Sequence, residues 1–173
     1  MIRITNIEEK FVPIVIKDEY TTISFDYESL YDEDDSENDT KKSIGTYSVH
    51  TFTRKVSFNQ IKAFILEEIN KRTDQSILSG FFWKDMPVWL STENQFNYKA
   101  AYDLAFQTNG ASLPTVFKFG DTENPIYYKF DTLDELQDFY VKAMTYINEQ
   151  LAIGWAKKDA IDWGAYEEAL KQL

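Results

Sequence analysis

The sequence contains no cysteine and no long hydrophobic run, and these two absences exclude several classes of protein. Without cysteine the chain has no disulfide bond, no thiolate nucleophile and no zinc–cysteine centre. It has no apolar stretch of about eighteen residues, so no transmembrane helix is expected. The segment MIRITNIEEKFVPIV places acidic residues where a signal peptide needs continuous apolar ones, so Sec export is not expected and synthesis in a cytoplasm fits.

Basic residues are the second deficit. The chain has 18 lysine and arginine residues against 29 acidic ones, which gives a net charge of −11. Both parts of the chain are acidic, because seven basic and twelve acidic residues precede position 57 and eleven and seventeen follow it. A chain without a basic half repels phosphate backbones and anionic lipids, so we expect no nucleic-acid partner and no membrane partner.

Residues with catalytic chemistry are also scarce. The only histidine, His50, lies in the strand-like stretch TYSVHTFTRKV, where packing or exposure is favoured over catalysis. A carboxylate pair is conceivable among Asp134, Glu135 and Asp138, but acidic residues also favour the first turns of a helix. The dinucleotide, P-loop, zinc-protease and G-x-S-x-G motifs are missing. The sequence therefore predicts no catalytic residue, no metal and no cofactor, and hence not an enzyme.

Residues 1–56 alternate apolar and polar side chains in a pattern typical of strands, which we expect over 11–16, 20–27 and 44–56. Between the last two, six carboxylates occupy the eight residues 32–39. An EF-hand loop beginning at Asp32 would place Glu37 where glycine is needed and Ser43 where glutamate is needed. The stretch is therefore predicted to be a solvated hairpin tip, with weak cation binding as the alternative.

From residue 57 the hydrophobic period changes to that of helices. Ser57 and Gln60 form a capping box, which begins a helix expected to end near Arg72. The stretch SGFFWKDMPVWL then predicts a tight hairpin around Lys84 and Asp85.

A second helix is predicted with Ser91 or Thr92 as its N-cap and with Asn109-Gly110 as its end. The polar residues 93–95 invite interpretation as a binding groove or catalytic helix, but helix-start roles explain them and are favoured. Its expected apolar stripe comprises Tyr98, Ala101, Tyr102, Ala105 and Phe106.

The remainder repeats the order of hairpin and helix. Residues 115–119 and 125–130 alternate across the turn GDTEN. Thr132 and Glu135 form another capping box at the start of a long amphipathic helix. Gly154 is expected to end or weaken that helix, Trp155 to pack back, and the stretch after it to form a short terminal helix. The helix's apolar stripe comprises Leu133, Leu136, Phe139, Tyr140, Ala143, Met144, Ile147 and Leu151.

The predicted fold class is therefore α+β. A strand-rich segment over 1–56 is followed over 57–173 by a domain of β-hairpins packed on two or three helices, one of them long. Aromatic residues are the one excess, with 4 Trp, 11 Tyr and 13 Phe. They can fill the core, anchor a protein interface or contact a glycan. Trp83 and Trp89 are expected to share one face of their hairpin and to be mostly buried.

A family resemblance covers about residues 57–173. Its parts are SGFFW…VWLS…QFNYKAA, the FKFG hairpin and the closing GW…KDAIDW, which are specific as a set. Together they resemble a phage domain of unknown function that is common in tail, tail-fibre and other virion gene clusters. It is found especially in phages of gut Bacteroides, including the crAss-like group. The resemblance carries no catalytic residues and implies a non-enzymatic virion component, with residues 1–56 as a protein-specific attachment and oligomerisation segment.

The function expected from the resemblance is that of a virion structural protein, made in the bacterial host cytoplasm. It would be a capsid-attached fibre or decoration subunit, or a tail accessory piece, that binds other virion proteins. The alternatives are a fibre-assembly chaperone and a glycan-binding receptor module. A dimer or trimer is expected, through the long helix or through unpaired strand edges of 1–56. The candidate interface residues are Phe11, Ile14, Ile16, Trp155 and Trp163.

Overall fold

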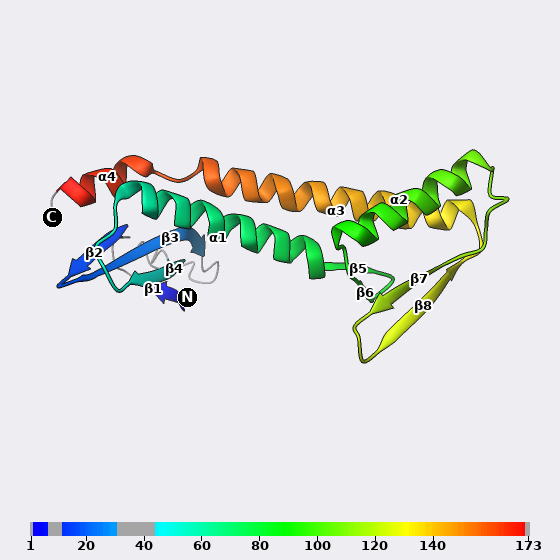
Figure 1. Ribbon diagram of the computed structural model, residues 1–173, viewed down its shortest axis with the longest axis horizontal. Helices are drawn as coiled ribbons and strands as arrows, with labels where there is room; N and C mark the ends of the chain where they lie inside the picture. The colour runs from blue at the N-terminus through cyan, green and yellow to red at the C-terminus, as the bar shows by residue number, and fades with distance from the viewer. Residues whose placement is uncertain (1, 7–11, 31–43, 172–173) are drawn as a thin grey trace, which may run out of the picture. The chain divides into compact units, whose positions relative to one another are not determined.

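The computed structural model describes residues 2–6, 12–30 and 44–171 (Figure 1). They form two compact units: the described residues of 1–68 and 157–173, and residues 69–156. Two helices, α1 (Phe58–Ser79) and α3 (Leu133–Asp159), contribute to both units. The fold class is α+β, as predicted. The proposed division of roles between 1–56 and 57–173 stays a prediction. The acidic stretch 32–39 lies outside the described residues.

The first unit contains an antiparallel sheet in the order β1-β4-β3-β2. The strands expected from the alternating pattern are present with shifted ends, since β4 stops at Phe52 rather than at Val56. The pattern does not indicate β1, whose five residues offer only two apolar positions. The strands are β1 (Ile2–Asn6), β2 (Ile14–Lys17), β3 (Tyr20–Leu30) and β4 (Ile44–Phe52).

One face of this sheet is covered by helices and forms the core of the first unit. Figure 1 shows α4 (Trp163–Lys171) and the first turns of α1 along it. Phe25 of β3 is buried, and its ring meets that of Phe64 edge-on with 6.1 Å between centroids. Tyr166 of α4 donates its hydroxyl to the carbonyl oxygen of Ser24 over 2.6 Å.

A β-bulge in β3 joins the sheet to the end of α3. The pairing register shifts between Phe25 and Glu28, and Asp26 adopts a positive φ of 56°. Bulges re-aim a side chain in this way. The Asp26 side chain is buried, and its Oδ1 lies 3.1 Å from the Lys157 ammonium. The bulge therefore ties the C-terminal part of the chain to the sheet within this unit.

The second unit packs two β-hairpins and α2 (Thr92–Gln107) against α3. The hairpins are β5 (Phe81–Trp83) with β6 (Met86–Val88), and β7 (Thr115–Gly120) with β8 (Pro125–Phe130). Leu136, Phe139 and Ala143 of α3 lie in the shared core, so the apolar stripe of the long helix faces the chain's own hairpins. The buried aromatic side chains are Phe81, Trp83, Tyr98, Phe117, Phe119, Phe130 and Phe139.

The predicted helix starts are confirmed by their hydrogen bonds. The Ser57 amide donates to Gln60 Oε1 over 2.9 Å, and the Gln60 amide donates to Ser57 Oγ over 3.4 Å. At the start of α2, Ser91 Oγ accepts from the Asn94 amide over 3.2 Å. Gly110, with a φ of 85°, follows the end of α2 and donates to the Ala105 carbonyl over 2.8 Å. The capping signals at Ser57 and Ser91 therefore mark the starts of α1 and α2.

α1 is longer than expected, because it ends at Ser79 rather than near Arg72. Of the polar residues that follow Arg72, Thr73 and Ser76 are half-buried, whereas Asp74, Gln75 and Ser79 are exposed. Thr73 donates its hydroxyl to the Ile69 carbonyl over 3.0 Å, and the Tyr146 hydroxyl donates to the Ser76 carbonyl over 2.9 Å. The two added turns also place Ile77 in the core of the second unit, and such packing stabilises a helix more than local propensity does.

Gly154 does not end α3, which continues to Asp159, so this expectation is wrong. A Cβ atom at position 154 would lie 2.4 Å from Thr73 Oγ1, so the glycine permits close approach of α1 and α3 within the second unit. Trp155 does not pack back and is 59% exposed. It lies about 100° around the helix from buried Gly154, away from the face that meets α1.

The expectation that Trp83 and Trp89 share a buried face is also wrong. Trp83 is 2% exposed, whereas Trp89 is 46% exposed. The turn has two residues, so Trp83 pairs with Met86 and their side chains lie on the same face of the hairpin. Side chains alternate along each strand, so the inward positions are 81 and 83 before the turn and 86 and 88 after it. Val88 and Leu90 are therefore buried, and Trp89 between them points outward.

The turn of this first hairpin is strained. Lys84 and Asp85 have φ values of 50° and 61°, and a turn with two left-handed residues favours glycine at the second. Replacing Asp85 with glycine is expected to raise the free energy of unfolding by about 0.5–1 kcal/mol, since the left-handed conformation costs other residues about 1–2 kcal/mol. Urea denaturation measures the change. Asp131→Gly, at a residue outside the left-handed region, should give no gain; equal effects of both would contradict the explanation.

Candidate functional site

Within the described ranges, no group of three or more His, Asp or Glu side chains is arranged to hold a metal ion. None of the helices in the same ranges has the length and hydropathy needed to cross a membrane.

His50 lies on the helix-covered face of the sheet in the first unit. Its ring stacks on Phe64 of α1 with 4.2 Å between centroids, and it meets Phe52 edge-on at 4.5 Å. Burial lowers the pKa of the imidazole, which opposes protonation. These contacts place His50 in an aromatic packing cluster, which is one of the two surroundings that the strand pattern left open.

The acidic residues at the start of α3 bind the first hairpin. The Glu135 carboxylate accepts from the Lys84 ammonium and from the Tyr128 hydroxyl, the latter over 2.6 Å. The Lys84 hydrogen bond, with that of Tyr128, lowers the Glu135 pKa. Asp138 accepts from Trp83 Nε1 over 3.3 Å. Glu135 therefore does not complete the predicted capping box with Thr132, although its amide donates to the Thr132 hydroxyl over 3.3 Å.

No sequence pattern indicates this cluster around Lys84, because Lys84 lies 44 residues from Tyr128 and 51 from Glu135. The Lys84 ammonium also lies 4.4 Å from the centroid of the Trp83 ring, in cation–π contact. The polar groups of Lys84, Tyr128 and Glu135 form hydrogen bonds with one another. The cluster therefore holds the β5–β6 turn against α3 and β8.

The predicted interface residues lie in different surroundings. Phe11 is outside the described residues. Ile14 is 5% exposed, and Ile16 is half-buried on the same face of β2. Trp163 is half-buried. The centroid of its ring lies 6.2 Å from the centroid of the Phe58 ring and 5.3 Å from the Lys62 ammonium. Only Trp155 among those described offers a largely exposed side chain.

Trp155 belongs to an exposed apolar segment of α3. Residues 152–156 read AIGWA, and all but Gly154 are exposed. Because 153 and 155 lie on either side of buried Gly154, their side chains project to both flanks of the helix. We call Ala152, Ile153, Trp155 and Ala156 the α3 collar. Exposed tryptophan beside aliphatic side chains is typical of a protein-binding surface.

A second apolar surface lies on α2. Phe96, Ala100 and Leu104 recur every four residues on its outer side and are exposed, with Phe96 reaching 71%. Phe106, expected in the buried stripe, is also exposed, whereas Tyr98 and Ala105 are buried. Sequence periodicity did not indicate this outer stripe, because α2 carries apolar residues on both sides.

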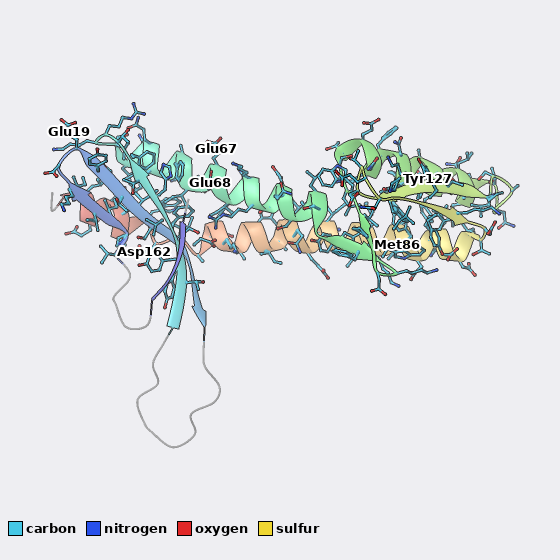
Figure 2. All side chains as sticks on the ribbon, turned by 90° about the horizontal axis from the view of Figure 1, so that it is seen from below. Glu19, Glu67, Glu68, Met86, Tyr127 and Asp162 are labelled. Carbon is cyan, nitrogen blue, oxygen red and sulfur yellow. The ribbon has the colours of Figure 1, made fainter. Side chains whose placement is uncertain are left out.

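The second unit thus combines a well-packed aromatic core with exposed apolar side chains on α2 and α3 (Figure 2, in which Met86 and Tyr127 mark the two hairpins). No curated protein and no solved structure matches this chain. One family matches over residues 60–172, which include the whole second unit. On that match, the chain belongs to the family described as domain of unknown function DUF4376.

Proposed function

We propose that this chain is a non-enzymatic structural protein of a bacteriophage virion. Its role is that of a capsid-attached fibre or decoration subunit, or of a tail accessory piece, which contacts other virion proteins. It would be made in the host cytoplasm and retained in the particle. The phage setting rests on the resemblance of residues 57–173 to virion gene products.

The observation that carries the interaction role is the α3 collar. A tryptophan that is 59% exposed on a regular helix loses apolar contact with water only when another surface covers it. Tryptophan is enriched among the residues that contribute most to protein–protein binding. The alanines at 152 and 156 leave room beside it for a partner's side chains.

Self-association is the form of interaction we favour. The apolar stripe of α3 cannot provide it, because Leu136, Phe139 and Ala143 are occupied by the hairpins of the same unit. The collar is the alternative on the same helix. In a dimer, a two-fold symmetric contact through it would pair equivalent tryptophans, as in isologous interfaces, and a trimer would use it in a heterologous contact.

Light scattering on the purified chain tests this proposal. We expect a mass two or three times 20.3 kDa at micromolar concentration, reduced to that of one chain by the double substitution Ile153→Ala and Trp155→Ala. Trp89→Ala is the matched control, because it removes another exposed tryptophan outside the collar. A single species of 20.3 kDa for the unsubstituted chain would contradict self-association.

A fibre-assembly chaperone is the alternative function, since it too would bind protein clients through exposed apolar side chains. The two roles differ in whether the protein is present in the assembled particle. A structural protein remains in the finished particle, whereas a chaperone is absent from it.

A further inference from the structure

The second unit contains a groove of about 590 Å³ on the outer side of its hairpins, a volume within the range typical of small-ligand sites. It is formed where the end of α1, strand β6, the start of α2 and the end of β7 meet. The residues that line it are Ser79, Pro87, Val88, Trp89, Asn94, Lys118, Gly120, Asp121 and Thr122.

Trp89 gives the groove an aromatic side. Its ring makes no contact with another aromatic ring of the described residues, in contrast to Trp83 in the core. Pro87 adds exposed apolar surface beside it. The face of an aromatic ring carries partial negative charge, so it attracts the polarised C–H groups on one face of a pyranose ring.

The polar groups of the groove are fixed by bonds within the chain. Asn94 donates through Nδ2 to the Trp89 carbonyl over 2.8 Å, which leaves its Oδ1 as an acceptor beside the tryptophan. Asp121 Oδ1 accepts from the amides of Glu123 and Asn124 over 2.8 and 2.6 Å. The Asn94 backbone amide also donates to Ser91 Oγ at the start of α2, so the same residue takes part in the helix cap and lines the groove.

The charges of the groove select against a strongly charged ligand. Lys118 supplies one ammonium, and no ion pair joins it to an acidic side chain in the described residues. The hydrogen bonds from Asn124, with that of Glu123, lower the pKa of Asp121, so its carboxylate is charged at neutral pH. One positive and one negative group match a neutral ligand that both donates and accepts hydrogen bonds.

We propose that this groove binds a neutral pyranose unit of a carbohydrate, which stacks on Trp89 and hydrogen-bonds to Asn94, Lys118 and Asp121. Hydroxyl groups on a sugar ring provide the donors and acceptors that this set requires, and its C–H face provides the apolar contact. The site does not depend on the α3 collar. It would add surface-glycan recognition to the structural role, and either proposal can fail alone.

Saturation-transfer NMR with the full-length chain tests the site. The probes are methyl α-D-mannopyranoside, methyl β-D-galactopyranoside and methyl N-acetyl-β-D-glucosaminide, each at millimolar concentration. We expect transfer to at least one probe, strongest at the C–H protons of one ring face. Trp89→Ala should weaken binding about tenfold, as removal of an aromatic contact residue does. Lys118→Ala should weaken it less, and Trp155→Ala should leave it unchanged.

Circular dichroism of each variant shows that the fold is kept, and the Lys118→Ala variant preserves the test if Trp89→Ala unfolds. Transfer to none of the three probes would overturn the proposal. Equal transfer to the unsubstituted chain and to both groove variants would overturn it too, because the sugar then binds elsewhere. Stronger binding of N-acetylneuraminic acid than of the neutral probes would overturn the assignment of a neutral ligand.

Discussion

Replacing Trp83 with alanine is expected to lower the free energy of unfolding by about 3–5 kcal/mol, the cost of emptying a large aromatic site in a packed core. The ring is 2% exposed and contacts Tyr128, Phe130 and Phe139 at 4.9, 5.1 and 5.4 Å between centroids. Its Nε1 also donates to Asp138, and this bond joins the first hairpin to α3.

Urea denaturation followed by circular dichroism measures this loss. The control is Trp89→Ala, which removes an equally large but half-exposed side chain outside the collar. The control should cost about 1 kcal/mol or less, because surface substitutions rarely cost more. If Trp83→Ala cost no more than this control, the packing described for the second unit would be wrong.

Gly154→Ala is expected to lower the free energy of unfolding by about 1–3 kcal/mol, although alanine is the better helix former by about 1 kcal/mol. The added methyl group would lie 2.4 Å from Oγ1 and 3.1 Å from Cγ2 of Thr73. Thr73 is held by its hydrogen bond to the Ile69 carbonyl, so the helices must separate to admit the methyl group.

A double-mutant cycle with Thr73→Ala separates this clash from other effects. Thr73→Ala removes both crowded atoms, so Gly154→Ala in that background should be neutral or stabilising, by up to about 1 kcal/mol. The same loss in both backgrounds would show that contact with Thr73 is not the reason for the glycine.

The local elements of this fold could be predicted from the sequence because their signals lie within a few residues of each other. The capping box at Ser57, the N-cap at Ser91 and the hairpin turns are examples, and hydrogen bonds confirm both caps. The α+β class followed from the change of hydrophobic period at residue 57.

Features set by packing between distant segments could not be predicted in this way. Gly154 resembles a helix end in the sequence, and only its contact with Thr73, 81 positions earlier, explains a glycine inside α3. The burial of Trp83 and exposure of Trp89 depended on the length of the turn between them, which sets the inward positions. The groove is lined by residues between 79 and 122, which in the sequence belong to helix ends, paired strands and a turn. Their proximity depends on the tertiary fold.

The proposed function has two parts, binding to other proteins and a place in the phage particle. The α3 collar supports protein binding, and the resemblance of residues 57–173 supports the place in the particle. Membership of DUF4376 is compatible with both but assigns neither, since the family is described as having unknown function.

Mass spectrometry of purified phage particles tests the central claim most directly. The particles are compared with lysate of the same infected cells, in which the chain is expressed. The proposed role predicts that the chain is recovered from the particles in a fixed ratio to the major capsid or tail protein. Its presence in the lysate but absence from the particles would contradict a structural role and favour an assembly chaperone.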